Sequence, residues 1–298
     1  MFDVPNRSAP GGACQIVRCR VCGLRRLDPR PSDDALPSFY GDDYYAHVGR
    51  RRTRPKQAAW DLLRDVSSGA DGRHGGWKLL QPLFERIATW RFDVNVPLDE
   101  RSQMVIDVGC GFGDLLLYLK SRGCCVQGVE LDPAAAETAH EYGVPVHVGD
   151  LQDLELPSAS VDVGILQHSL EHLAEPNRVL GELARVIRPG GSLHIAVPNG
   201  AAAGLAIEKE TWAFLSNPVH FWYFDEMTLR KLLRRHDFVV ERIGYRTTWV
   251  NYWTPSRTQM KSGLPLLACE RIGRVLARRL KSAAAGDILR AVATRAAA

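Results

Sequence analysis

A glycine-rich turn that follows an apolar run constrains the fold of this chain more than any other feature. The stretch VIDVGCGFGDLL occupies residues 105–116 and contains three closely spaced glycines, Gly109, Gly111 and Gly113. The apolar run before them predicts a strand, and the leucine-rich segment after them predicts a helix. Glycines at such a turn let a ligand approach the backbone, while the N-terminus of the helix offers N–H groups. The stretch therefore predicts the first strand-to-helix turn of an α/β sheet and a nucleotide-like ligand beside it.

The sequence on either side of this turn alternates between two patterns. Short apolar runs such as CVQGVEL, VDVGILQ and SLHIAVPN alternate with segments of helical spacing such as PAAAETAHEYG and PNRVLGELARVIRPGG. Strands that alternate with helices indicate a parallel sheet with helices on both faces. Two later runs, which begin at Phe238 and Ile288, predict the last two strands. We therefore expect a doubly wound α/β fold.

Composition excludes several classes of protein. The chain has 298 residues, of which 45% are hydrophobic and 24% charged, so it can bury a full core. Its formal net charge of +4 is small and dispersed, which argues against a nucleic-acid partner. We find neither a signal-peptide pattern nor a run of the ~20 apolar residues that cross a bilayer. The seven cysteines form no small-domain disulfide pattern, and we expect a cytoplasmic protein.

The spacing of the glycines separates two classes of nucleotide-binding sheet. The dinucleotide fingerprint G-x-G-x-x-G would need a third glycine at position 114, where the chain has Asp114. This departure disfavours a nicotinamide-dependent oxidoreductase. Glu130 stands at the end of the next predicted strand, where a carboxylate can accept hydrogen bonds from both ribose hydroxyls.

Five motifs in order resemble those of class I S-adenosylmethionine-dependent methyltransferases. They are D-V-G-C-G-F-G at residues 107–113, G-V-E-L-D-P around Glu130, H-V-G-D-L with Asp150, L-Q-H-S-L-E-H-L from Leu166, and R-V-I-R-P-G-G ending at Gly191. The resemblance covers roughly residues 100–245. It implies a Rossmann-like, mostly parallel sheet of seven strands, with one antiparallel strand inserted beside the sixth, and S-adenosylmethionine as the cofactor.

The same resemblance implies a role for each motif. Asp107 and the glycine turn would hold the methionine end of the cofactor, and Glu130 its ribose. Asp150 would bind the adenine amino group, Leu151 would line the adenine ring, and Gln167 would lie beneath the sulfonium. Taken singly, Glu130 is also typical of a helix start and Asp150 of a turn cap. The full set of expected cofactor-binding residues is Asp107, Gly109, Cys110, Gly111, Gly113, Glu130, Leu131, Asp150, Leu151 and Gln167.

The acceptor side resembles a subgroup that includes ubiquinone-type O-methyltransferases and enzymes of polysaccharide and secondary-metabolite clusters. The segments E-H-L-A-E-P from Glu171 and N-P-V-H-F-W-Y-F around His220 carry this resemblance. It implies a small hydroxylated or sugar-like acceptor such as a sugar, polyketide or quinone, with O-methylation mildly favoured. We expect His220 to be the catalytic base and keep His172 as a second candidate, although both are also compatible with structural roles. A non-catalytic regulatory protein that retains the fold is the competing hypothesis.

The segment His168-Ser-Leu-Glu171-His172 also matches H-x-x-E-H, a zinc-peptidase pattern. Here the pattern begins at the end of a predicted strand rather than inside a long helix, so we disfavour a peptidase and assign no metal ligands. The sequence leaves open whether a divalent ion assists the acceptor hydroxyl.

The flanking segments differ in composition from the central region. Residues 1–50 resemble the latter half of a zinc ribbon, because Cys19 and Cys22 form one C-x-x-C knuckle and Cys14 lies nearby. The first knuckle of such a ribbon is missing, so we expect a degenerate ribbon-like segment that has lost zinc. Residues 51–100 predict a helical cap, and residues 101–298 the cofactor-binding domain, with a basic amphipathic insertion at about 250–285. Such a helix can touch a membrane surface, but is more often packed on one side and solvated on the other.

Overall fold

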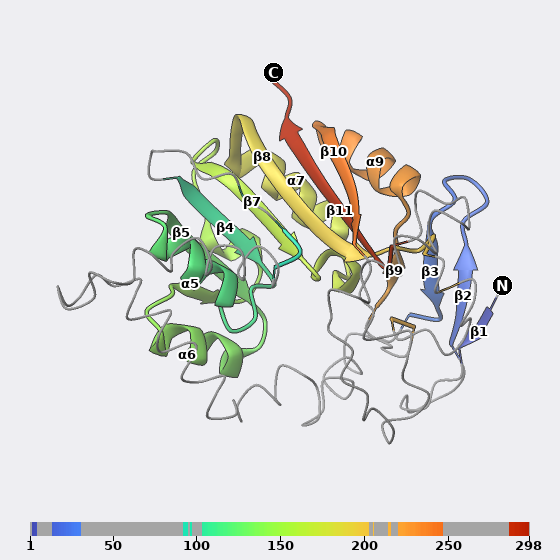
Figure 1. Ribbon diagram of the computed structural model, residues 1–298, viewed down its shortest axis with the longest axis horizontal. Helices are drawn as coiled ribbons and strands as arrows, with labels where there is room; N and C mark the ends of the chain where they lie inside the picture. The colour runs from blue at the N-terminus through green and yellow to red at the C-terminus, as the bar shows by residue number, and fades with distance from the viewer. Residues whose placement is uncertain are drawn as a thin grey trace, which may run out of the picture.

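The computed structural model describes residues 2–4, 14–30, 92–94, 96, 103–202, 205, 214–215, 220–246 and 286–297 (Figure 1). Its main element is a sheet of seven strands in the order β10-β11-β8-β7-β4-β5-β6. The strands are β4 (Met104–Val108), β5 (Cys125–Glu130), β6 (Val146–Val148), β7 (Val161–Gln167), β8 (Ile187–Pro198), β10 (Phe238–Arg246) and β11 (Ile288–Arg295).

The direction of the strands confirms the predicted fold. The pairs β4 with β5, β5 with β6, β4 with β7 and β7 with β8 are all parallel. Only β11 runs against its neighbours, because it pairs antiparallel with both β10 and β8. The predicted antiparallel strand beside the sixth is therefore present, and the carboxyl ends of β4, β5, β6 and β7 meet at one edge of the sheet.

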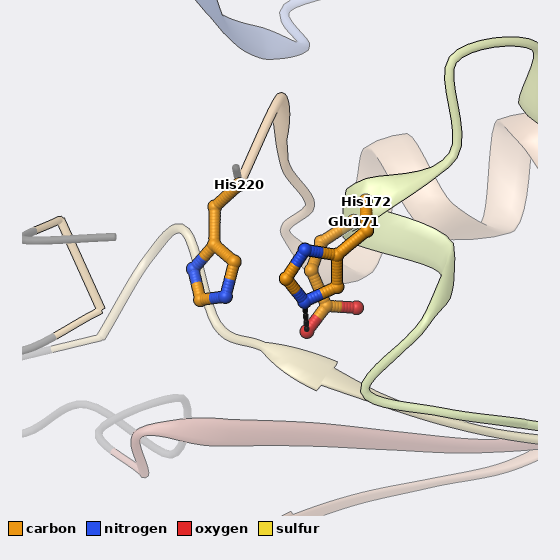
Figure 2. A group of neighbouring side chains, drawn as sticks. All are labelled: Glu171, His172 and His220. Carbon is orange, nitrogen blue, oxygen red and sulfur yellow. Dashed lines mark ion pairs between the residues drawn. The ribbon is translucent and has the colours of Figure 1, made fainter. Parts of the chain in front are cut away.

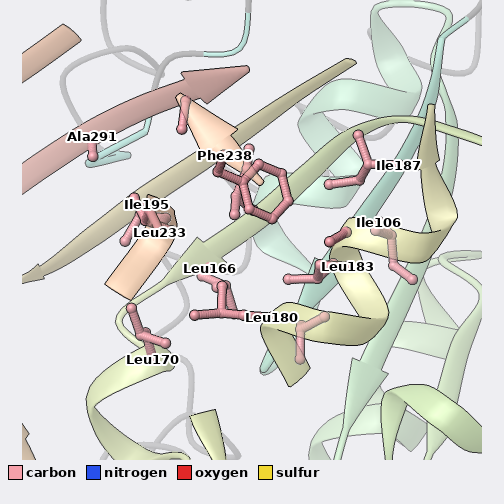
Figure 3. Close-up of a cluster of buried hydrophobic side chains, with 14 of the residues drawn as sticks. Ile106, Leu166, Leu170, Leu180, Leu183, Ile187, Ile195, Leu233, Phe238 and Ala291 are labelled. Atoms are coloured by element: carbon pink, nitrogen blue, oxygen red, sulfur yellow. The ribbon is translucent and has the colours of Figure 1, made fainter. Parts of the chain in front are cut away.

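Two hydrophobic cores, one on each face of the sheet, hold this architecture together. The helices are α5 (Asp114–Ser121), α6 (Pro133–Glu141), α7 (Pro176–Val186) and α9 (Glu226–Arg234), with short 3-10 turns η4 (Leu151–Leu154) and η5 (Leu170–His172). Along β4, Val105 packs in the core that contains α5 and α6, whereas Ile106 packs in the core that contains α7 and α9. Figure 3 shows the second core, where Leu180 and Leu183 of α7 lie close to Leu166 of β7. Successive side chains of a strand thus point into opposite cores, as expected for a sheet that is buried on both sides.

The starts of two helices follow ordinary capping rules. The side chain of Asp132 accepts a hydrogen bond from the backbone N–H of Ala134, and Pro133 occupies the first position of α6. At α9, Asp225 accepts a hydrogen bond of 2.8 Å from the backbone N–H of Thr228. These caps satisfy backbone donors that a helix leaves unpaired, and they fix where each helix leaves the sheet edge.

The N-terminal segment joins the main domain through a second sheet. The strands β1 (Phe2–Val4), β2 (Cys14–Arg18), β3 (Arg25–Asp28) and β9 (Trp222–Tyr223) pair in that order. The β2–β3 turn carries Cys19 and Cys22, which are both exposed. Hydrogen bonds from the backbone of Cys22 and Val21 lower the pKa of the Cys19 thiol to about 7. The loss of zinc and the domain boundary near residue 50 stay predictions.

Two sequence predictions fall outside the described residues. These are the helical cap at 51–100, except for residues 92–94 and 96, and the amphipathic insertion at 250–285. None of the helices in the described part of the chain combines the length and the apolar composition that a membrane span requires.

Candidate functional site

The glycine turn lies at the carboxyl end of β4, where the sequence placed it. The backbone N–H groups of Gly109 and Cys110 both donate to the carbonyl oxygen of Val129, at 2.8 and 3.1 Å, which ties the turn to β5. Gly109 and Gly111 have φ angles of 76° and 54°. A Cβ atom on Gly109 would lie 2.6 Å from the Cβ of Ser169, whereas a Cβ on Gly111 would meet nothing within 4 Å. Gly109 is therefore needed for packing, and Gly111 borders open space.

Glu130 is anchored at the end of β5 by three backbone donors. Its Oε2 accepts a hydrogen bond of 2.8 Å from the N–H of Gly111. Its Oε1 accepts bonds of 2.8 and 3.0 Å from the N–H groups of Leu131 and Asp132. A carboxylate can accept about four hydrogen bonds. Oε2 can therefore accept one more hydrogen bond. This is enough for one ribose hydroxyl, whereas the sequence suggested bonds from both.

Asp107 lies beneath the glycine turn and is 3% exposed. Among the described residues, no group donates a hydrogen bond to its Oδ1 atom. Burial, together with the charge of Glu130, raises the pKa of Asp107 to about 8. A buried carboxyl group with an unsatisfied oxygen is costly unless a donor or a cation reaches it. The ammonium group of an amino-acid moiety would meet this need.

The other expected cofactor residues occupy different environments. Leu131 is 69% exposed although it is a large apolar side chain, so it offers a surface on which a flat ring could lie. Leu151 is 2% exposed and belongs to the core. Asp150 forms an exposed ion pair with Arg178 at 3.3 Å. Burial, with Asp107 nearby, raises the pKa of the Cys110 thiol. Taken together, the unsatisfied Asp107, the open space at Gly111 and the exposed Leu131 fit an S-adenosylmethionine molecule at this edge.

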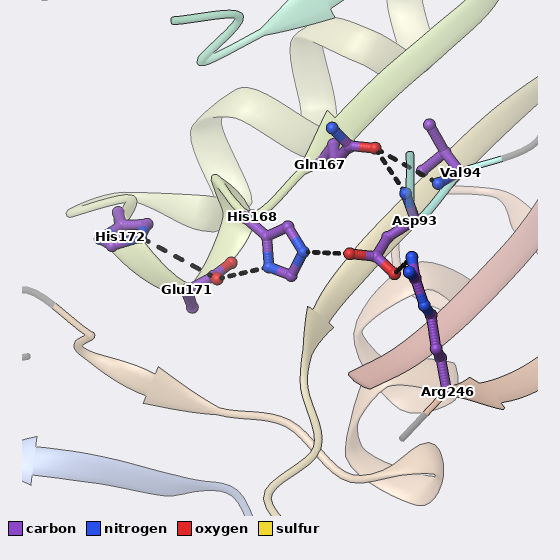
Figure 4. Close-up of polar contacts among 7 residues, drawn as sticks. All are labelled: Asp93, Val94, Gln167, His168, Glu171, His172 and Arg246. Carbon is purple, nitrogen blue, oxygen red and sulfur yellow. Dashed lines mark hydrogen bonds and ion pairs between the residues drawn. The ribbon is translucent and has the colours of Figure 1, made fainter. Parts of the chain in front are cut away.

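Gln167 ends β7 and holds a segment that precedes the sheet. Its Oε1 accepts hydrogen bonds from the backbone N–H groups of Asp93 and Val94, at 2.9 and 3.3 Å. Figure 4 shows that the side chain of Asp93 in turn lies between His168 and Arg246. Neither Asp93 nor Arg246 has a signal in the sequence, because neither belongs to a motif and both are far from position 167 in the chain.

The structure brings the two candidate histidines together. His172 and His220 are in edge-to-face contact, with ring centroids 4.6 Å apart. The Nδ1 atom of His220 is 2.9 Å from the carbonyl oxygen of Phe214, so it donates its proton there and leaves the lone pair of the neutral ring on Nε2. Burial, and next the nearby His172, lowers the pKa of His220 to about 3. Figure 2 shows Glu171 beside this pair, and its Oε1 is 3.9 Å from the Nε2 of His172.

These three side chains could offer one carboxylate oxygen and two imidazole nitrogens to a metal ion. Their ligand atoms lie within 4.8 Å of one another. The separation of 3.9 Å between Glu171 and His172 exceeds the roughly 3.0–3.5 Å between neighbouring ligands of one zinc ion. In addition, the ring of His168 is 3.7 Å from the same carboxylate oxygen and competes for its charge. The assignment of no metal ligands therefore stays our prediction.

Most of the described aromatic residues from Phe214 to Phe224 belong to the core. Phe221, Tyr223 and Phe224 are each at most 1% exposed. Trp222 is partly buried, and its indole N–H donates to the carbonyl oxygen of Leu173 at 2.7 Å. Within the described residues, these side chains hold the His220 segment against η5 rather than form an open acceptor pocket.

Comparison with known proteins agrees with this geometry. Residues 106–195 match the family model described as "Methyltransferase domain". The chain is similar to the ubiquinone biosynthesis O-methyltransferase of Xanthomonas oryzae pv. oryzae, with 30% identity over 121 residues that cover 38% of this chain and 51% of that protein. It is also similar to the trans-aconitate 2-methyltransferase of Mycobacterium tuberculosis, with 28% identity over 130 residues that cover 41% and 49%. The chain thus spans about half the length of the curated relatives it matches.

Among solved structures, a SAM-dependent methyltransferase from Archaeoglobus fulgidus has the same fold. The two chains superpose with a TM-score of 0.51 and 17% sequence identity, over 79% of this chain and 99% of the other. This likeness supports the architecture alone.

Proposed function

We propose, on the premise that this chain carries a class I S-adenosylmethionine-dependent methyltransferase domain, that it transfers a methyl group to a small acceptor molecule. The observation that carries this proposal is the edge formed by β4 and β5. There the unsatisfied carboxyl of Asp107 lies under the glycine turn, and the anchored Glu130 keeps one acceptor position. S-adenosylmethionine is the cofactor of this family, and when bound it supplies a methyl group that is already activated by a sulfonium.

The residues of this edge would each contact a different part of the cofactor. Asp107 would accept a hydrogen bond from the ammonium group of the cofactor, and Glu130 one from a ribose hydroxyl through Oε2. Leu131 would contact the adenine ring, with Asp150 near its amino group. The remaining expected residues would form the glycine turn and the floor of the site; they are Gly109, Cys110, Gly111, Gly113, Leu151 and Gln167.

His220 is the proposed proton acceptor, with His172 beside it. A hydroxyl oxygen that gains a methyl group becomes strongly acidic, so even a weakly basic neutral imidazole can take its proton at Nε2. The nearby charge of Glu171 would stabilise the imidazolium that forms, while the hydrogen bond to Phe214 keeps the ring oriented. Catalysis by this site would consist mainly of positioning and of removing one proton.

The acceptor we propose is a small hydroxylated or sugar-like metabolite such as a sugar, polyketide or quinone. The names of two similar proteins mention small molecules, ubiquinone and trans-aconitate, which supports a small acceptor. O-methylation is favoured because a histidine is available to accept a hydroxyl proton. A nucleic-acid acceptor is not part of the proposal, and the proposed compartment is the cytoplasm.

Calorimetric titration tests the cofactor part of the proposal. S-adenosylmethionine should bind to the purified protein with micromolar affinity, and NADH should not bind. Glu130→Gln should weaken S-adenosylmethionine binding about tenfold or more, which is ~1.4 kcal/mol. This variant keeps the size of the side chain but removes its charge and replaces one acceptor oxygen by a donor. Glu137→Gln changes an exposed glutamate on α6 and should leave the affinity unchanged.

The outcomes separate the competing hypotheses. Binding followed by a methyl gain on a small hydroxylated acceptor, detected by mass spectrometry, supports the enzyme. Tight binding without methyl transfer to any class of acceptor would favour the regulatory protein, and absence of S-adenosylmethionine binding would contradict both.

Asp107 makes cofactor binding dependent on pH. Because the pKa of Asp107 is about 8 before binding, its carboxyl group is mostly neutral at pH 7. An ammonium partner favours the ionised form, so binding should release a proton and affinity should rise with pH up to about 8. Titration of S-adenosylhomocysteine at pH 7, in two buffers with different ionisation enthalpies, measures the released protons. Asp107→Asn should abolish the release, and an equal release in that variant would assign it to another group.

A further inference from the structure

Five charged or titratable side chains form a continuous row, and the proposed mechanism gives a role to only some of them. Figure 4 shows the row running from Arg246 at the end of β10, through Asp93 and His168, to Glu171 and His172. Arg246 Nη1 is 2.7 Å from Asp93 Oδ1, and His168 Nε2 is 2.8 Å from Asp93 Oδ2. Asp93 therefore contacts two cations with its two oxygens.

The backbone around Asp93 is fixed from two sides. Gln167 accepts hydrogen bonds from the N–H groups of Asp93 and Val94, as described above. The side chains of Phe92, Val94 and Val96 are each at most 7% exposed and pack in the core on the α5 and α6 face. With its neighbours held in this way, the carboxylate of Asp93 has a defined position next to the motif loop that follows β7.

His168 lies between two carboxylates in an unusual backbone conformation. Its φ angle is 55°, in the left-handed region that residues other than glycine seldom adopt, and such strain persists only where the surroundings enforce it. Its Nε2 faces Asp93, and its Nδ1 lies 3.7 Å from Glu171 Oε1. Burial would lower the pKa of His168, but the hydrogen bond to Asp93 and the interactions with Glu171 raise it to about 10.

The cationic ring of His168 favours the ionised form of Glu171. Its side chain is fully buried, and among the described residues neither of its oxygens accepts a hydrogen bond. Burial would raise the pKa of Glu171, but His168, His172 and His220, which face it, lower that pKa below its ordinary value. A buried carboxylate without such neighbours would take up a proton, and it could then no longer stabilise an imidazolium.

We propose that Asp93 is a positioning residue for methyl transfer: it holds His168 as a cation against Glu171, and through Glu171 it orients and stabilises the histidine pair His172 and His220. The proposal rests on the proposed function, in which His220 accepts the proton. Arg246 supports it from the other side by neutralising the second oxygen of Asp93.

The direct test is NMR of the full chain labelled with ¹⁵N in its nine histidines, with His168 assigned from the spectrum of His168→Gln. In the wild-type protein both ring nitrogens of His168 should stay protonated at pH 8. In Asp93→Asn the pKa of His168 should fall by at least one unit, toward the ordinary ~6.5. Asp162→Asn is the matched control, because Asp162 also pairs with an arginine and accepts a backbone hydrogen bond, but at the start of β7.

Two results would overturn the inference. One is a neutral His168 at pH 8 in the wild-type protein, which needs no variant to be observed. The other is an unchanged His168 in Asp93→Asn, with the melting temperature measured to show that the variant is folded.

A kinetic measurement separates this inference from the proposed function. With an acceptor in hand, Asp93→Asn should lower kcat about tenfold or more while the affinity for S-adenosylmethionine changes less than twofold, since general bases contribute ~10²–10⁴ in rate and positioning supplies part of that. Asp93→Glu should recover part of the loss. Absence of methyl transfer in every protein, wild type included, would count against the proposed function, whereas transfer that is unaffected in Asp93→Asn would count against the inference alone.

Discussion

Gly109→Ala should destabilise the protein by about 2–5 kcal/mol, the sum of two penalties. Gly109 has a φ angle of 76°, and a side chain in the left-handed region costs ~1–2 kcal/mol. The new Cβ would lie 2.6 Å from the Cβ of Ser169, and overpacking of this kind costs ~1–3 kcal/mol. Because Ser169 belongs to the loop between β7 and η5, relief of the clash would move the segment that carries Glu171 and His172. Urea denaturation measures the loss.

Two companion variants separate these penalties. Gly111→Ala carries a similar conformational penalty, with a φ angle of 54°, but its Cβ would meet nothing within 4 Å, so it should cost only ~1–2 kcal/mol. It should instead weaken S-adenosylmethionine binding, because the methyl group enters the space proposed for the cofactor. Gly109→Ala combined with Ser169→Gly should recover the overpacking part of the loss. Equal destabilisation by Gly109→Ala and Gly111→Ala would contradict the packing argument.

The sequence predicted the sheet well because strands and helices leave local patterns. The alternation of short apolar runs and helical segments predicted a parallel sheet, and the run that begins at Ile288 predicted a last strand, which the family resemblance placed antiparallel beside the sixth. These elements were found because their burial repeats every two or about four residues along the chain. The pairing of the N-terminal hairpin with β9 had no such signal, since the register of Arg25 with Tyr223 joins segments far apart in the sequence.

In the candidate site, too, contacts between residues far apart in the sequence could not be predicted. The motifs pointed to Asp107 and Glu130 together, yet only the structure distinguishes an unsatisfied buried carboxyl from one that three backbone donors anchor. Asp93 had no sequence signal, because it contacts His168 across a separation of 75 residues and this contact is set by tertiary packing. His168 appeared within the motif that begins at Leu166 and within a pattern that also occurs in peptidases, and its left-handed backbone could not be read from either.

The most informative catalytic variant is His220→Asn. The amide nitrogen of asparagine can take the place of Nδ1 and donate to the carbonyl oxygen of Phe214, but the side chain offers no basic nitrogen. We therefore expect kcat for methyl transfer to a hydroxyl to fall about 100-fold or more, since general bases contribute ~10²–10⁴ in rate. The affinity for S-adenosylmethionine should be unchanged. His236→Asn is the control, because His236 contacts Asn177 on the surface.

The pH dependence of kcat is a second test of whether His220 is the base. A base must be deprotonated to act, and burial together with His172 lowers the pKa of His220 to about 3. Its neutral form is therefore complete well below neutral pH, and kcat should show no loss attributable to His220 between pH 5 and 8. A fall in kcat with a midpoint near the ordinary histidine value of ~6.5 would assign the proton transfer to a different histidine. If that midpoint persisted in His220→Asn with kcat unchanged, His220 would serve only to pack the loop against η5.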